Sequence, residues 1–165
     1  MLVEMKIAAL ASDPYTNVPF LLLRDLQEKV SFPIWIGILE AGAIAAELEK
    51  VKLKRPMTHD LFYQTLQTLG ASLKQVEIVA LRDNTFFALL RLVDRSGQER
   101  GVDCRPSDAI ALALRAGSPI YAEEQVIREA QAGDHGDRAK ADPGALPQDR
   151  EKWKEYLASL SPEEF

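Results

Sequence analysis

The sequence lacks the residues that a disulfide-stabilised, exported or membrane-spanning protein needs. It has one cysteine, Cys104, which excludes an internal disulfide and is typical of a reducing compartment. No apolar run approaches the ~18 residues that cross a bilayer. The start at Met1 lacks the basic stretch and long apolar run of an export signal. We therefore expect a cytoplasmic protein that does not enter a membrane.

An excess of positive charge is also missing. The chain has 20 lysines and arginines against 25 aspartates and glutamates, which gives a formal net charge of −5. This charge argues against a strongly basic nucleic-acid binder and is compatible with a local basic cluster. The cysteine and histidine spacing of zinc sites is absent. So are the Gly-rich loops of kinases and P-loop enzymes and the Gly-x-Ser-x-Gly pattern of α/β-hydrolases. We expect neither zinc nor a nucleotide cofactor.

What is present is the composition of a folded domain with a short appendage. Of the 165 residues, 47% are hydrophobic and 27% are charged, and a chain of this length buries a core without a metal or disulfide. Residues 1–130 form the predicted domain, and residues 131–150 read as a flexible linker because they show no apolar periodicity. Residues 151–165 predict a short amphipathic helix that docks on its own domain or on a neighbouring subunit. Such a tail favours a homo-oligomer, with a dimer as the default.

Hydrophobic periodicity and turn residues predict strands and helices in a definite order. The expected strands are 2–11, 18–24, 30–36, 73–81, 85–93, 98–104 and 120–121. The expected helices are 38–51, 59–69 with Thr58 as its cap, 106–116, and 123–130.

A sequence pattern occurs twice in this order. Phe-x-Leu-Leu-Arg ends at Arg24 and again at Arg91, and Ala-Ile-Ala follows around Ile44 and Ile110, at separations of 20 and 19 residues. Each copy predicts three strands and then a helix. The fold class is therefore α+β, with a mostly antiparallel sheet built from a duplicated β-β-β-α unit and an extra helix between the halves.

Two predicted helix starts carry an arginine before a proline, at Arg55 and Arg105. Free N–H groups at a helix start attract anions, and arginine binds phosphate through two parallel hydrogen bonds. Together with Ser107, these arginines are the predicted phosphate-binding residues. The alternative for Ser107, and for Asp60 and Asp108 nearby, is ordinary capping of a helix start.

Acidic residues and one histidine complete the predicted site. Glu40, Asp60, Asp103 and Asp108 are candidate ligands for magnesium or manganese, since carboxylate oxygens suit hard cations. His59, with Asp60 and Asp108, is a candidate catalytic residue, because imidazole acts as a general base near neutral pH. The alternatives are ion pairs between the carboxylates and the arginines, and a partly exposed histidine without a catalytic role.

Three blocks of residues resemble one known family. The blocks are 34–45, 55–61 and 103–113, and together they look like the signature of the bifunctional nuclease family, over a stretch that runs to about residue 130. Gly42 departs from the pattern, in which we expect a larger polar residue. The resemblance implies an α+β domain that cleaves both DNA and RNA.

Two functions follow from these observations. The first is a metal-dependent nuclease that hydrolyses the phosphodiester bonds of DNA and RNA, and the family resemblance favours it. The alternative is a non-catalytic regulatory domain that binds an anion or a partner protein with the same helix starts. Unpaired carboxylates would bind manganese, whereas carboxylates paired with arginine would not, so the pairing of the acids distinguishes the two.

Overall fold

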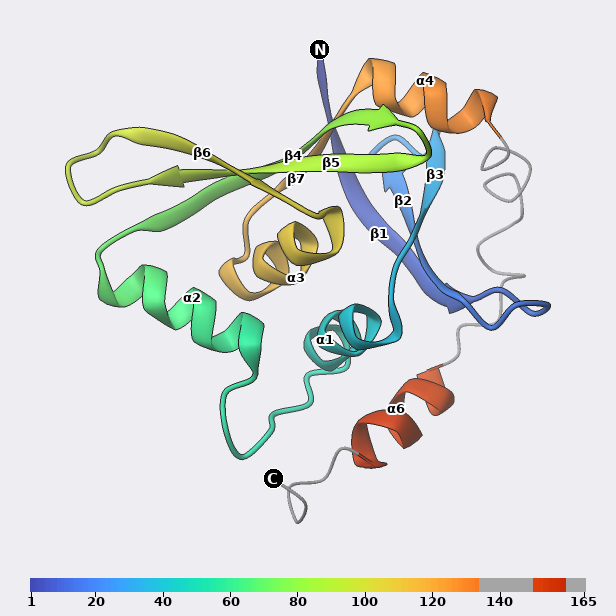
Figure 1. Cartoon of the computed structure of the whole chain (residues 1–165), viewed down its shortest axis with the longest axis horizontal. Coiled ribbons are helices and arrows are strands. Elements are labelled where there is room, and N and C mark those ends of the chain that lie inside the picture. Colours follow the sequence, from blue (N-terminus) through green and yellow to red (C-terminus); the bar gives the residue numbers. More distant parts are fainter. Residues whose placement is uncertain (134–149, 160–165) are drawn as a thin grey trace.

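The computed structural model describes residues 1–133 and 150–159, and a seven-stranded sheet forms their centre. The strands lie in the order β3-β2-β1-β7-β4-β5-β6 (Figure 1). Neighbouring strands are antiparallel except β4 and β7, which are parallel. The strands are β1 (Leu2–Ser12), β2 (Pro19–Asp25), β3 (Ser31–Trp35), β4 (Ser72–Arg82), β5 (Thr85–Val93), β6 (Glu99–Cys104) and β7 (Ile120–Glu123).

Five helices in the described residues pack on this sheet or on one another. They are α1 (Ile38–Leu48), α2 (Thr58–Thr68), α3 (Pro106–Ala116), α4 (Glu124–Ala132) and α6 (Arg150–Ser159). The helix α3 is the central one, because it contacts α1, α2, β4 and β5, and its residues 109–113 are buried. Pro106 begins it and Gly117 ends it with a left-handed φ of 66°. No helix among the described residues is long and apolar enough to cross a membrane.

The duplicated unit is confirmed in element order and in strand pairing. The strands β1, β2 and β3 form one antiparallel meander followed by α1, and β4, β5 and β6 form another followed by α3. The strand β7 joins them between β1 and β4, and α2 is the extra helix between the halves. The α+β class with a mostly antiparallel sheet is thereby confirmed. The duplication makes the starts of α1 and α3 equivalent positions.

Several predicted helix ends differ from the structure by one to three residues, among them those on either side of the connection between α1 and α2. The helix α1 ends at Leu48, not at residue 51, because Lys50 takes a left-handed φ of 56° and the Val51 N–H bonds to the Ala46 carbonyl. The helix α2 begins at Thr58 with Met57 as its N-cap, one residue before the predicted cap. Residues 49–57 consequently form a loop that connects α1 to α2.

The tail helix α6 packs on α1 in the described chain. Trp153 and Leu157 are buried there, and the Tyr156 ring lies over Gly42. A Cβ atom at Gly42 would come within 2.8 Å of Tyr156 Cε1, so glycine makes this close approach possible. Residues 134–149 of the predicted linker lie outside the described residues, and the predicted self-association stays a prediction.

Candidate functional site

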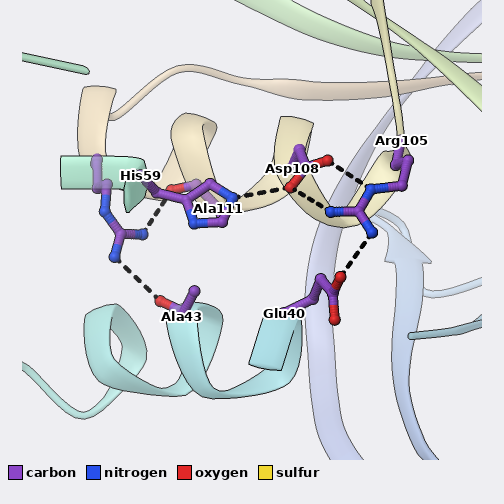
Figure 2. A network of polar contacts seen from close by, with 7 residues as sticks. Glu40, Ala43, His59, Arg105, Asp108 and Ala111 are labelled. Carbon is purple, nitrogen blue, oxygen red and sulfur yellow. Dashed lines mark hydrogen bonds and ion pairs between the residues drawn. The ribbon is translucent and has the colours of Figure 1, made fainter. Parts of the chain in front are cut away.

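Four side chains meet where α1, α2 and α3 come together, and we call them the Arg105 network: Glu40, His59, Arg105 and Asp108. Arg105 donates from Nη1 to Glu40 Oε1 at 2.6 Å. It also donates to Asp108, from Nε to Oδ2 at 2.7 Å and from Nη2 to Oδ1 at 3.1 Å. His59 Nε2 lies 2.9 Å from Asp108 Oδ1 (Figure 2). One carboxylate therefore joins an arginine to a histidine.

The duplication explains why two of these carboxylates lie on either side of Arg105. Gly37 and Arg105 are the N-cap residues of α1 and α3, so Glu40 and Asp108 occupy the same third helical position. Figure 2 shows the two helix starts side by side. A Cβ atom at Gly37 would lie 2.2 Å from Glu40 Oε2, so glycine leaves room for this carboxylate to fold back toward its helix start.

Burial and charge distinguish the members of the network. The His59, Glu40 and Asp108 side chains are 15%, 19% and 27% exposed, whereas that of Arg105 is 63% exposed. Burial raises the pKa of Asp108, but the hydrogen bonds from Arg105 and His59 more than offset this, and the pKa lies below its usual value. Hydrogen bonds to Asp108 and Glu40 raise the pKa of Arg105. The network thus holds two carboxylates and a guanidinium that reaches solvent.

A pocket of about 240 Å³ adjoins the network, and Arg105 and Glu40 form part of its wall. Its other lining residues are Ile34, Trp35, Ile36, Gly37, Asn84, Thr85, Phe86, Pro106 and Ser107. The charged residues lie among apolar and aromatic side chains, with an amide and hydroxyls beside them. Such a lining suits a ligand that combines an anionic group with a flat, apolar one.

A second ion pair holds the same three helices together, and the sequence analysis missed it. Arg115, on α3, donates from Nε to Asp60 Oδ1 at 2.6 Å. Its Nη1 and Nη2 donate to the carbonyls of Ala111 and Ala43 at 2.9 and 3.2 Å. The Arg115 side chain is only 6% exposed. The sequence contained one signal for this ion pair, an arginine near the end of an otherwise apolar helix. A charge buried in such a helix needs a partner.

Asp60 is the predicted catalytic residue that lies apart from the network. It caps α2 by accepting from the Met57 N–H at 2.9 Å, and it pairs with Arg115. Its partner Arg115 lies seven residues after Asp108 on α3, about 10 Å along the helix axis, so Asp60 and Asp108 contact different parts of α3. Burial raises the pKa of Asp60, but the bonds from Met57 and Arg115 outweigh it and lower the pKa. Capping, the alternative that the sequence left open for Asp60, is what the structure contains.

Of the remaining predicted site residues, Ser107 lies beside the Arg105 network, whereas Asp103 and Arg55 do not contact it. Ser107 is buried and lines the pocket. Asp103 is exposed on β6, and Arg55 is exposed in the loop before α2. Within residues 1–133 and 150–159, no hydrogen bond joins Asp103 or Arg55 to the Arg105 network. The structure thus brings together Glu40, His59, Arg105 and Asp108, with Ser107 beside them.

Each clustered carboxylate already has an arginine as partner. Arg105 holds Glu40 and Asp108, and Arg115 holds Asp60. Within the described parts of the chain, no group of three or more histidine, cysteine, aspartate or glutamate side chains is arranged to hold a metal ion. A cation at Glu40 and Asp108 would have to displace the guanidinium from both. Magnesium or manganese binding stays a prediction.

Cys104 precedes Arg105 but is not an activated nucleophile. Burial, together with the negative charges of Asp108 and Asp103, raises the pKa of its thiol to about 11. The sulfur lies 3.6 Å from the Ala88 carbonyl oxygen on the neighbouring strand. The structure therefore gives Cys104 a packing role at the end of β6.

Comparison with known proteins places this site in a family. Residues 21–134 match the family described as the bifunctional nuclease domain. The chain belongs to this family. Every residue of the Arg105 network and of the pocket lies inside the matched segment, whereas β1 and α6 lie outside it.

Curated relatives of this bifunctional nuclease domain protein match it over nearly its whole length. They are "Uncharacterized protein MT1877" and "Uncharacterized protein Rv1829", from two strains of Mycobacterium tuberculosis, CDC 1551 / Oshkosh and ATCC 25618 / H37Rv. Each is 43% identical to this chain over 166 residues, which covers 98% of this chain and 97% of the relative. The similarity thus includes the C-terminal tail as well as the matched domain.

Proposed function

We propose that the chain is a nuclease that hydrolyses phosphodiester bonds of nucleic acid at the Arg105 network. One observation carries the proposal: Asp108 bonds at the same time to a solvent-reaching arginine and to a largely buried histidine. A phosphate-binding group and a proton acceptor thereby lie on either side of one carboxylate. Phosphodiester hydrolysis needs both, because negative charge grows on the phosphate while the attacking hydroxyl loses a proton.

The Asp108 contact determines which nitrogen of His59 is the base. With its pKa lowered, Asp108 is an ionised carboxylate that only accepts hydrogen bonds. His59 Nε2 must therefore donate to it, and the neutral ring carries its lone pair on Nδ1. In the proposed reaction Nδ1 takes a proton from the attacking water, whose oxygen bonds to phosphorus while the bond from phosphorus to the leaving oxygen breaks. The leaving oxygen takes up a proton from the solvent. Asp108 orients the ring and stabilises the imidazolium that forms.

Arg105 retains donors for a phosphate. A guanidinium has five N–H groups, and the network uses three of them, one each on Nε, Nη1 and Nη2. One N–H on each terminal nitrogen is left for phosphate oxygens. In the proposal these donors neutralise the charge that develops on the phosphate, in the bidentate geometry that arginine prefers.

The adjoining pocket supports nucleic acid over a simple inorganic anion as the substrate. Its lining residues Trp35 and Phe86 offer aromatic surface for a base, and Asn84 offers an amide for a base edge. A nucleotide combines a phosphate with a flat base, and the lining of this pocket combines a charged arginine with aromatic residues.

A specific observation favours the alternative of a non-catalytic anion-binding domain. Arg105 is bonded to carboxylates from two helices, so the same contacts that form the proposed site also hold α1 and α3 together. A purely structural role for the network explains these contacts equally well. The alternative predicts binding of nucleic acid, or of another anion, without cleavage.

Cleavage of labelled single- and double-stranded DNA and RNA tests the proposal, with manganese, with magnesium and with EDTA. We expect His59→Gln to lower the rate about 100-fold or more, the usual contribution of a general base. The control is Asp94→Asn, which removes a carboxylate paired with Arg100 at the opposite end of β6. It should leave the rate within about twofold of the parent.

Each outcome distinguishes the proposals. Loss of cleavage in folded His59→Gln, with Asp94→Asn unaffected, supports the nuclease. Cleavage in EDTA supports acid–base chemistry by the chain's own residues, whereas a strict manganese requirement supports the predicted cation. Equal cleavage by the parent and His59→Gln overturns the assignment of the site. Binding without cleavage under every condition supports the non-catalytic domain.

A further inference from the structure

The loop between α1 and α2 carries an unusual group of cations, Lys50, Lys52, Lys54 and Arg55, which we call the cationic loop. All four are exposed. Most other lysines and arginines among the described residues pair with a carboxylate, for example Lys74 with Glu99 and Arg91 with Glu77. The four cations take part in no ion pair or side-chain hydrogen bond within residues 1–133 and 150–159. Four positive charges therefore lie within residues 50–55, a segment that contains no acid, after Glu47 and Glu49 at the end of α1.

Local backbone structure directs these charges outward. Lys50 takes a left-handed φ of 56° at the end of α1 and turns the chain out of the helix. Val51 and Leu53 are partly buried, with Val51 packed against the core, while Lys52 and Lys54 on either side of Leu53 are exposed. This alternation is that of an extended segment, in which successive side chains point to opposite sides. The lysines thus share the solvent side of the loop.

The cationic loop is near the proposed site but does not touch it. It follows the C-terminal end of α1, whereas Glu40 of the Arg105 network lies in the first turn of the same helix. The 11 residues of α1 span about 16 Å. At about 3.4 Å per nucleotide of a stacked strand, this distance corresponds to about five nucleotides. The loop leads directly into α2, which supplies His59.

Exposed apolar side chains lie next to the cationic loop. Met57, Leu61 and Phe62, at the start of α2, are 48%, 59% and 41% exposed. Met57 and Leu61 are four residues apart and share one face of the helix. Single-stranded nucleic acid presents unpaired bases that stack on an aromatic side chain such as Phe62 and pack on apolar ones, while lysines hold its backbone. A duplex keeps its bases covered, so this combination of cations and apolar surface favours a single strand.

We propose that the cationic loop and the exposed start of α2 bind single-stranded nucleic acid whose scissile phosphate lies at Arg105. The strand runs from the Arg105 network along α1 and α2 to the loop. This inference rests on the proposed nuclease function for the position of the cleaved bond, and its binding part is measurable without cleavage. The loop supplies affinity for long strands and takes no part in the chemical step.

The test compares two variants with the same change in net charge. The loop variant carries Lys50→Gln, Lys52→Gln and Lys54→Gln. The control variant carries Lys29→Gln, Lys74→Gln and Lys154→Gln, which removes three lysines that are exposed elsewhere. Both variants also carry His59→Gln for binding measurements, so that the probe is not cut. The probe is a dye-labelled 12-nucleotide oligothymidylate, followed by fluorescence anisotropy over a range of salt concentrations.

We expect the loop variant to bind the 12-nucleotide probe at least tenfold more weakly than the control variant at low salt. Each phosphate contact contributes about 0.7 to the slope of log affinity against log salt for a single strand, so loss of three contacts should reduce the slope by about two. With His59 restored, cleavage of a trinucleotide, which is too short to reach the loop, should be equal in the two variants. Binding of a 12-base-pair duplex should differ less than binding of the single strand.

Two results would overturn the inference. One is equal affinity and equal salt slope for the loop and control variants. The other is a fall in trinucleotide cleavage as large as that for the long strand, which would place the loop in the chemical step or in folding. Failure of the nuclease proposal gives a different result, namely no His59-dependent cleavage while the difference in binding between the two variants persists.

Discussion

Arg115 is the polar side chain whose replacement we expect to cost this domain the most stability. Its guanidinium joins three helices, through Asp60 of α2, the Ala43 carbonyl of α1 and the Ala111 carbonyl of its own helix. Arg115→Met retains most of the apolar stem and removes only these hydrogen bonds. The change therefore measures what the buried charge contributes to holding α2 in place.

The magnitude follows from the contacts. All three Arg115 hydrogen bonds have a charged donor, and a hydrogen bond of this kind contributes about 1.5–3 kcal/mol when both partners are buried. Asp60 is 32% exposed and regains water in the variant, which reduces the loss. The two carbonyls lie in helices and retain their helical partners. We expect Arg115→Met to lower the free energy of unfolding by about 2–4 kcal/mol, close to the range for breaking a buried ion pair.

Urea unfolding followed by the fluorescence of the two tryptophans measures this change. With a urea slope of about 2 kcal/mol per M, the midpoint should fall by about 1–2 M. Arg128→Met, which removes an exposed arginine paired with Glu124, is the matched control and should change stability by less than about 0.5 kcal/mol. Hydrogen exchange of the α2 amides should also accelerate in Arg115→Met. A midpoint shift no larger than that of the control would refute the argument that Arg115 anchors α2.

Three further predictions test other parts of the structure. The Cys104 thiol has a pKa of about 11 against an ordinary 9.0, so at pH 8 it should react with a disulfide reagent about 100-fold more slowly in the folded protein than in the protein unfolded by urea. Rapid labelling of the folded protein would contradict the burial of this thiol. Burial raises the pKa of Glu77, but hydrogen bonds from Arg91 and Gln75 outweigh this effect and lower the pKa. The difference in stability between the parent and Glu77→Gln should therefore be full above pH 5 and shrink as the pH falls below 4.5. An unchanged difference at pH 3.5 would contradict this. Gly42→Ala should destabilise the chain and expose α6 to protease, because the added Cβ would meet the Tyr156 ring. Alanine by itself favours a helix by ~1 kcal/mol over glycine, so in a Tyr156→Ala background the same change should stabilise the chain.

Much of the fold was predictable because its signals are local. The turn between β4 and β5 lies at Asp83 and Asn84, both with positive φ, as residues prone to turns allow. Gly117 ends α3 in the left-handed conformation that glycine favours. The two Phe-x-Leu-Leu-Arg segments predicted the duplicated unit, which the strand pairing confirms. The errors occurred at helix ends, where a single backbone angle, such as that of Lys50, decides where a helix stops.

The candidate site was predictable in part, since helix starts can be read from the sequence but their partners cannot. Glu40, His59, Arg105 and Asp108 were all selected for chemical reasons, and the structure brings them together. Asp60 was selected on the same grounds, yet it pairs with Arg115. Arg115 was overlooked because a lone arginine in an apolar helix does not indicate which carboxylate it will meet.

The sequence by itself determined the repeated β-β-β-α unit and the third helical positions of Glu40 and Asp108. Hydrophobic period, capping residues and spacing are enough for that. Only the tertiary structure decided which acids share an arginine. His59 and Asp60 are adjacent on α2, and adjacent side chains on a helix point about 100° apart. The way in which α2 docks on α3 therefore directs His59 to Asp108 and Asp60 to Arg115, and this docking depends on contacts between segments distant in the chain.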